Sequence, residues 1–151
     1  MTQPGELVQK ACACLVDARG HLLVFRHPGD QSMQLPKGTV EPGEEPHDAV
    51  RRELLEESGI RFDGRLEPLG TLDRFCPAGG VEGTRIAHPQ LWHLYLMRST
   101  GAWPETFEHV AIGSPEENGL RFAFRWLAPD APIDDFLLPY QQAIARARAA
   151  I

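Results

Sequence analysis

The spacing of hydrophobic and polar positions changes several times along the chain, and each change predicts a boundary between strands, helices and loops. Strands are predicted where β-branched residues flank small ones, where apolar residues run together, or where apolar and polar residues alternate. These segments are residues 8–16, 21–26, 61–75, part of 85–97, and 121–127. The second segment has an apolar middle that indicates burial on both faces. The fourth carries bulky residues on both faces, which indicates a central strand.

Two segments predict helices. Residues 46–58 begin with Pro46, which a first helical turn tolerates, and end before Gly59, which suits a left-handed helix stop. From Asp134 onward, apolar side chains recur at three- and four-residue spacing, with Pro139 in the early turns. The order of these elements predicts an α/β fold in which helices flank a mixed sheet.

The connections between these elements are rich in glycine and proline, or their hydrophobic residues follow no regular spacing. Residues 17–20 predict a hairpin turn with Gly20 at positive φ. Residues 34–36 are short and extended. Loops are predicted over residues 37–46, 77–83 and 99–119. A loop as long as the last one is usually functional or mobile inside a compact domain.

Length and composition restrict the classes of function. The chain has 151 residues, the size of one domain, and its 42% hydrophobic and 24% charged residues exclude a collagen, a coiled coil and wholesale disorder. The net charge of −6 argues against a large nucleic-acid interface. We find no 18-residue apolar run and no basic, apolar leader, so we expect no membrane span and no secretory signal. Three cysteines do not make a disulfide scaffold, so we expect a cytoplasmic protein.

The first predicted helix carries an unusual cluster of charge. Glu53, Glu56 and Glu57 stand at i, i+3 and i+4, which places them on one helical face within an arc of about 100°. Like charges at this spacing repel, and the last turns of a helix disfavour anions. A solvated acidic face is one interpretation. Otherwise a positive group offsets both penalties, either Arg52 reaching Glu56 or a divalent cation such as Mg²⁺ or Mn²⁺.

The residues around this cluster follow a specific spacing. Gly38 is followed by five residues and Glu44, and seven further residues lead to Arg52-Glu53-Leu54-Leu55-Glu56-Glu57-Ser58-Gly59-Ile60. This segment resembles the Nudix box, G-x5-E-x7-R-E-U-x-E-E-x-G-U with U aliphatic, and every fixed position is filled. The resemblance implies a Nudix-type α/β/α sandwich over a single domain, residues 1–151. It also implies a pyrophosphohydrolase that acts on a nucleoside diphosphate linked to another moiety.

The resemblance further implies roles for individual residues. Its metal-binding set consists of three carboxylates and one backbone carbonyl, those of Glu53, Glu56, Glu57 and Gly38. Arg52 and Glu44 would orient this set, and Mg²⁺ or Mn²⁺ would be the cofactor. Either Glu53 or Glu57 could accept the proton of the attacking water. A carboxylate of the long loop is the third alternative, and the candidates are Glu105, Glu108, Glu116 and Glu117.

The evidence for the substrate is weaker. A small-molecule nucleotide is the expected partner, and a homodimer stays open. Arg26 and Lys37 are candidate phosphate contacts, and Trp103 in the long loop is a candidate for stacking on a base. Trp92 and Tyr95 are expected in the core, and His93 and His109 are expected to pack or hydrogen-bond rather than bind metal. Pro77 lies only near the position of a proline marker of ADP-sugar hydrolases.

Two other classes of protein compete with a hydrolase. One is a Nudix-fold binding or regulatory domain without activity, which usually has an incomplete box. The other is the isomerase branch of the fold, which acts on isoprenoid diphosphates and would need a cysteine such as Cys76 in its site. The complete box favours the hydrolase.

Overall fold

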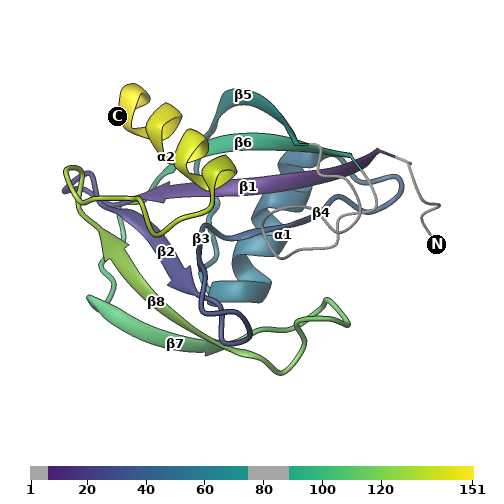
Figure 1. Cartoon of the computed structure of the whole chain (residues 1–151), viewed down its shortest axis with the longest axis horizontal. Helices are drawn as coiled ribbons and strands as arrows, with labels where there is room; N and C mark the ends of the chain where they lie inside the picture. Colours follow the sequence, from purple (N-terminus) through teal and green to yellow (C-terminus); the bar gives the residue numbers. More distant parts are fainter. Residues whose placement is uncertain (1–6, 75–88) are drawn as a thin grey trace.

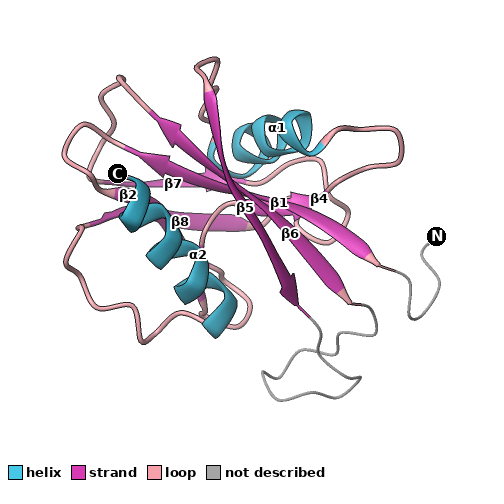
Figure 2. Cartoon of the chain, turned by 90° about the horizontal axis from the view of Figure 1, so that it is seen from above, coloured by secondary structure: helices cyan, strands magenta, loops and turns pink. Residues whose placement is uncertain are grey.

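A mixed sheet lies between two helices (Figures 1 and 2). The structure is a computed structural model, and it describes residues 7–74 and 89–151. Within those residues, eight strands form one sheet. The strands are β1 (Val8–Val16), β2 (Leu22–Arg26), β3 (Met33–Gln34), β4 (Lys37–Thr39), β5 (Leu66–Arg74), β6 (Gln90–Arg98), β7 (Thr106–Val110) and β8 (Arg121–Leu127). The helices are α1 (Pro46–Ser58) and α2 (Leu138–Ala150).

The sheet has the strand order β5-β6-β1-β2-β8-β7, with β3 paired to β2 and β4 paired to β1. Strand β1 runs parallel to β6 along its whole length. On its other side, β1 pairs with β4 over Lys10–Cys12 and with β2 only where Val16 meets Leu22. The sheet therefore opens between β1 and β2, and β4 occupies that opening.

Each helix covers one face of the sheet, and β1 contributes to both faces because its side chains alternate. On one face, Ala11, Ala13 and Leu15 pack in a buried cluster with Ala49, Val50 and Leu54 of α1. On the other face, Cys12 and Cys14 pack with four residues of α2. These residues are Tyr140, Ala143, Ile144 and Ala147. The predicted α/β/α arrangement is confirmed.

Several local predictions are confirmed. Helix α1 spans the predicted residues, and Gly59 closes it in the left-handed region at φ 78°. Gly20 takes φ 82° in the hairpin turn, as expected. Strand β6 is internal, and Leu22–Phe25 of β2 are buried throughout.

Other boundaries were wrong. The predicted loop 37–46 begins with β4, whose three residues are ordered by backbone pairing with β1 rather than by any hydrophobic pattern. The predicted loop 99–119 contains β7, which among the residues that the structure describes is an edge strand paired only with β8. Strand β5 begins at Leu66 rather than 61, and α2 begins at Leu138 rather than 134.

A few predictions fall outside the described residues. These are the end of the third predicted strand at Phe75, the loop 77–83 with Pro77, the thiol of Cys76, and the start of the strand at 85–88.

Candidate metal centre

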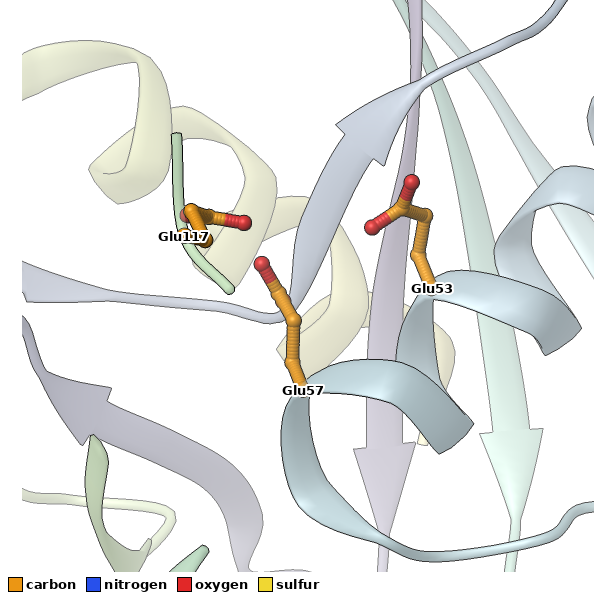
Figure 3. Close-up of side chains that lie close together, drawn as sticks. All are labelled: Glu53, Glu57 and Glu117. Atoms are coloured by element: carbon orange, nitrogen blue, oxygen red, sulfur yellow. The ribbon is translucent and has the colours of Figure 1, made fainter. Parts of the chain in front are cut away.

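Three carboxylates converge where α1 faces β4 and the loop after β7. Glu53 and Glu57 lie one turn apart on α1, and only 5% and 2% of their surfaces are exposed. Glu117 comes from the loop between β7 and β8 and points toward Glu57 (Figure 3). Each of the three offers an oxygen, and these oxygens all lie within 4.8 Å of one another. The arrangement is a compact set of anionic oxygen ligands.

The end of α1 positions the loop that carries Glu117. The last carbonyl groups of a helix lack partners within the helix. Here the carbonyl of Glu57 meets Nδ1 of His109 at 2.9 Å, and the carbonyl of Glu56 accepts a hydrogen bond from the backbone N–H of Ile112 at 3.1 Å. Strand β7 and the start of the following loop are therefore held against α1, which brings Glu117 to Glu57.

Strand β4 lies against the carboxylates with its backbone. A Cβ atom on Gly38 would lie 1.9 Å from Cδ of Glu53, so no side chain fits there. The next residue back, Lys37, donates its backbone N–H to Oε1 of Glu57 at 2.9 Å. Gly38 therefore leaves the space in which the Glu53 carboxylate lies, and Lys37 fixes Glu57.

Arg52 connects the carboxylates to the preceding loop. Its guanidinium binds both oxygens of Glu44, with Nε and Nη2 at 2.8 and 2.9 Å. Its Nη1 donates to Glu53 at 2.8 Å and to Glu56 at 3.1 Å, and Nη2 donates to the carbonyl of Thr39 at 3.0 Å. The guanidinium holds the pKa of Glu44 below its usual range. These bonds connect Glu44 to the carboxylates of α1 through Arg52.

Glu56 occupies a separate position. It does not belong to the set formed by Glu53, Glu57 and Glu117, although Arg52 binds its carboxylate. A Cβ on Gly113, which has φ 99°, would lie 2.3 Å from Oε1 of Glu56, so the loop backbone passes directly over this side chain.

Together, the carboxylates of Glu53, Glu57 and Glu117 carry more negative charge than their surroundings stabilise. Burial raises the pKa of Glu57 well above its usual range, and the adjacent Glu117 and Glu53 add to the effect. Burial also raises the pKa of Glu53, against the opposing effect of Arg52. Closely spaced, buried carboxylates of this kind fit a hard divalent cation, which prefers oxygen ligands. The residues present therefore suit the predicted cofactor.

A cavity of about 450 Å³ opens beside the carboxylates, and both lysines of the chain line it. Lys10 on β1 donates from Nζ to Oγ1 of Thr39 at 2.7 Å. Nζ of Lys37 lies 4.4 Å from the ring centroid of Trp92, and burial lowers the pKa of Lys37 to about 8. Sequence reasoning missed Lys10, because its position depends on the pairing of β1 with β4.

The remaining predicted residues divide between this cavity and other places. Of the four loop carboxylates, Glu116 and Glu117 line the cavity. Glu105 instead pairs with Arg19 at 2.7 Å, and Glu108 pairs with Arg121 at 3.4 Å.

Arg26 and Trp103 lie away from the carboxylates. Arg26 lines a second cavity and donates to the carbonyl of Gln31 at 2.8 Å. Trp103 lines a third cavity beside the β1–β2 turn, and its Nε1 donates to Oγ of Ser99 at 3.1 Å. Neither side chain lines the acidic cavity.

Trp92 is buried in the core and His109 forms a hydrogen bond, as expected. Tyr95 is only partly buried and packs against the hydrophobic cluster on the α1 side of the sheet, so the expectation that it lies in the core is met in part. Nε2 of His93 lies 2.8 Å from the side-chain oxygen of Gln9.

Comparison with known proteins agrees with the fold and the box. The NUDIX domain family matches residues 7–147, and the chain belongs to this family. An RNA pyrophosphohydrolase of Rhodopseudomonas palustris (strain BisB18) is 27% identical over 95% of this chain and 87% of its own length. These two matches support the predicted class, a Nudix pyrophosphohydrolase.

Solved structures share the fold. The MutT protein from Methanosarcina mazei Go1 superposes with a TM-score of 0.70 at 13% identity, over 99% of this chain and 98% of its own. The dihydroneopterin triphosphate pyrophosphohydrolase of E. coli gives a TM-score of 0.69 at 16% identity, over 95% and 96% of the two chains.

Within residues 7–74 and 89–151, neither helix is long and apolar enough to cross a membrane.

Proposed function

We propose that this protein is one Nudix domain that hydrolyses the pyrophosphate bond of a nucleoside diphosphate linked to another moiety, with Mg²⁺ or Mn²⁺ as cofactor. The observation that carries the proposal is the convergence of Glu53, Glu57 and Glu117 beside the Gly38 backbone. The complete box and the pyrophosphohydrolase relative support it.

The reaction adds one water across a phosphoanhydride. The water oxygen bonds to one phosphorus, the bond from that phosphorus to the bridging oxygen breaks, and the bridging oxygen leaves with the second phosphate. A carboxylate accepts the proton that the water loses. When bound, Mg²⁺ or Mn²⁺ supplies positive charge that neutralises the phosphates and polarises the attacking water.

The residues of the chain divide this work. We assign cation binding to Glu53, Glu56 and Glu57 with the carbonyl of Gly38, and we add Glu117 to that list of candidate ligands. Arg52 and Glu44 position the carboxylates through the bonds described above. Lys37 contacts substrate phosphate.

The proton acceptor belongs to the group of Glu53, Glu57 and Glu117. Arg26 and Trp103 are not assigned to the phosphate site, because they line other cavities.

One panel assay tests the function. Nucleotide sugars, dinucleoside polyphosphates and nucleoside triphosphates are incubated with Mg²⁺ or Mn²⁺, and the phosphate products are quantified for wild type, Glu57→Gln and Glu108→Gln. We expect turnover in wild type and in Glu108→Gln, and loss of about 10²-fold or more in Glu57→Gln. Nucleotide binding without turnover would instead identify a non-catalytic domain, and undiminished turnover in excess chelator would contradict the cofactor.

A further inference from the structure

Two of the last carbonyl groups of α1 receive hydrogen bonds from outside the helix. They belong to Glu56 and Glu57, and the donors are the backbone N–H of Ile112 and the ring of His109. A carbonyl oxygen only accepts, so the ring nitrogen that faces it, Nδ1 of His109, carries the hydrogen. Because this bond is made by a side chain, a substitution can remove it and leave the backbone unchanged.

The ring of His109 lies in a space that Gly59 leaves open. A Cβ atom on Gly59 would lie 2.8 and 2.9 Å from Cδ2 and Nε2 of this ring. Gly59 ends α1 at φ 78°, and its missing side chain also lets the ring approach the helix end. On β7, His109 shares a face with Phe107, whose ring stacks on Phe124 with centroids 5.0 Å apart. The ring of His109 is therefore placed by the sheet and by the helix end together.

After β7, the chain forms a turn that carries Glu117 on its own hydrogen-bonded frame. The carbonyl of Ala111 accepts a hydrogen bond from the N–H of Gly119 at 2.8 Å. Inside this frame, the carbonyl of Ser114 accepts a hydrogen bond from the N–H of Glu117 at 3.2 Å. The position of Glu117 therefore follows that of the whole segment 111–120.

The carboxylates of Glu57 and Glu117 repel each other when both are ionised. Their oxygens lie within 4.8 Å of one another, and Glu57 is only 2% exposed, so water screens the repulsion poorly. The repulsion pushes the segment 111–120 away from α1. The bond from His109 opposes this movement, and it acts on the backbone of one of the two repelling residues.

We propose that His109 is a positioning residue for the hydrolysis, and that its bond to the Glu57 carbonyl sets the position of Glu117 relative to Glu57. The inference rests on the proposed function, in which both carboxylates are candidate ligands and proton acceptors. His109 does not line the acidic cavity, so it acts through these carboxylates and not on the substrate. Loss of the bond should therefore lower kcat and leave KM nearly unchanged.

Two substitutions separate the hydrogen bond of His109 from the packing of its ring. His109→Asn keeps a donor at the place of Nδ1 and removes the ring, whereas His109→Phe keeps a ring against Gly59 and removes the donor. Glu108→Gln changes an exposed neighbour on β7 and serves as the control. Each protein is assayed at saturating Mg²⁺ with the nucleotide substrate that wild type hydrolyses best, and its Tm is measured beside kcat and KM.

We expect His109→Phe to lower kcat by about 10-fold to 100-fold, with KM within about 3-fold of wild type, because small displacements of positioned groups are costly in rate. His109→Asn should keep kcat within about 3-fold of wild type although its Tm falls by about 2–6 °C, since the packing of the ring is lost. Glu108→Gln should match wild type. Losses of kcat that follow the losses of Tm in both variants would show that His109 only stabilises the fold, and wild-type kcat in His109→Phe would equally overturn the proposal.

A double-mutant cycle tests whether His109 acts through Glu117. Glu117→Gln alone should lower kcat by about 10²-fold. Adding His109→Phe to it should slow the enzyme by no more than about a further 3-fold, because the carboxylate that the bond positions is already gone. Independent effects would multiply to a loss of about 10³-fold to 10⁴-fold, and that result would refute the route through Glu117.

Amide hydrogen exchange, which needs no turnover, separates this proposal from the proposed function. The N–H of Ile112 bonds to the carbonyl of Glu56, so its exchange reports whether the segment 111–120 lies against α1. Measured by NMR on metal-free protein, this exchange should be at least about 10-fold faster in His109→Phe than in wild type or His109→Asn. If wild type hydrolyses no substrate, the proposed function fails, and faster exchange still supports the positioning of this segment by His109. Equal exchange in His109→Phe and wild type would overturn the proposal even where hydrolysis is observed.

Discussion

Replacing Gly38 with alanine should lower kcat/KM strongly and the stability of the fold only modestly, because the new methyl group would displace a carboxylate of the metal centre. The new Cβ would lie 1.9 Å from Cδ of Glu53 and 2.1 and 2.2 Å from its oxygens. Contacts of this kind are essentially never shorter than 3.0 Å, so the Glu53 carboxylate or the β4 backbone has to shift by about 1 Å. Arg52 binds that carboxylate at 2.8 Å, and Glu53 is only 5% exposed, so the movement breaks an ion pair or displaces core atoms.

The size of the effect should differ between folding and catalysis. Overpacking of this kind costs about 1–3 kcal/mol of unfolding free energy, a loss that a domain of this size survives. A shift of about 1 Å in a positioned group can cost 10²-fold in rate. We therefore expect Gly38→Ala to fold, to lose about 1–3 kcal/mol in denaturant titrations, and to lose at least about 10²-fold in kcat/KM.

Gly20→Ala provides the matched control. The backbone of Gly20 disfavours alanine because of its φ of 82°, whereas its new Cβ would meet Pro129 Cγ at 3.4 Å and a methyl group of Ile151 at 3.9 Å, which are ordinary contacts. Its loss of stability should be about 1 kcal/mol or more, with kcat/KM at the wild-type level. Wild-type kcat/KM in Gly38→Ala would refute the reasoning, because it would show that the position of Glu53 does not matter for catalysis.

Three further results are expected. Glu117→Gln removes one carboxylate of the converging group and should lower kcat by about 10²-fold or more, whereas Glu108→Gln should not; equal kcat in the two variants would remove Glu117 from the site. Because burial raises the pKa of Glu57 above its usual 4.5, the native state binds that proton more tightly than the unfolded chain does. Without metal, the unfolding free energy of wild type should therefore fall relative to Glu57→Gln as pH rises above about 4.5, and denaturant titrations showing a constant difference would contradict the burial argument. Arg52→Lys keeps the charge but loses the two-pronged bond to Glu44, so thermal melting should show a loss of about 1–3 kcal/mol; an unchanged Tm would mean that this contact adds nothing to stability.

The parts of the site that could be predicted from sequence depend on local signals. Helix α1 carries its own start and stop in Pro46 and Gly59, and its carboxylates are fixed relative to one another by helical spacing alone. The fixed spacing of the box likewise identified Gly38 and Arg52, and the structure brings both into contact with Glu53.

The parts that were missed depend on contacts between distant segments. Strand β7 lies at the edge of the sheet and turns Thr106, Glu108 and Val110 to solvent, so it carries little hydrophobic signal. Its position against α1 depends on bonds from His109 and Ile112 to helix carbonyls. These contacts, together with the hydrogen bonds within residues 111–120, place Glu117 beside Glu57, and no local signal in the predicted loop indicates them.

The position of Lys10 in the cavity has a similar origin. It depends on the three-residue pairing of β1 with β4, which no periodicity in the sequence indicates.

The cation-binding role of the converging carboxylates is tested most directly by titrating Mn²⁺ into metal-free protein and measuring its affinity by calorimetry. Wild type, Glu57→Gln and Glu108→Gln are compared, with Mg²⁺ as competitor. We predict that wild type and Glu108→Gln bind Mn²⁺ equally well and release it to excess Mg²⁺, and that Glu57→Gln binds at least about 10-fold more weakly. The same affinity in all three proteins, or no binding to wild type, would contradict the assignment of Glu57 and its neighbours as a metal centre.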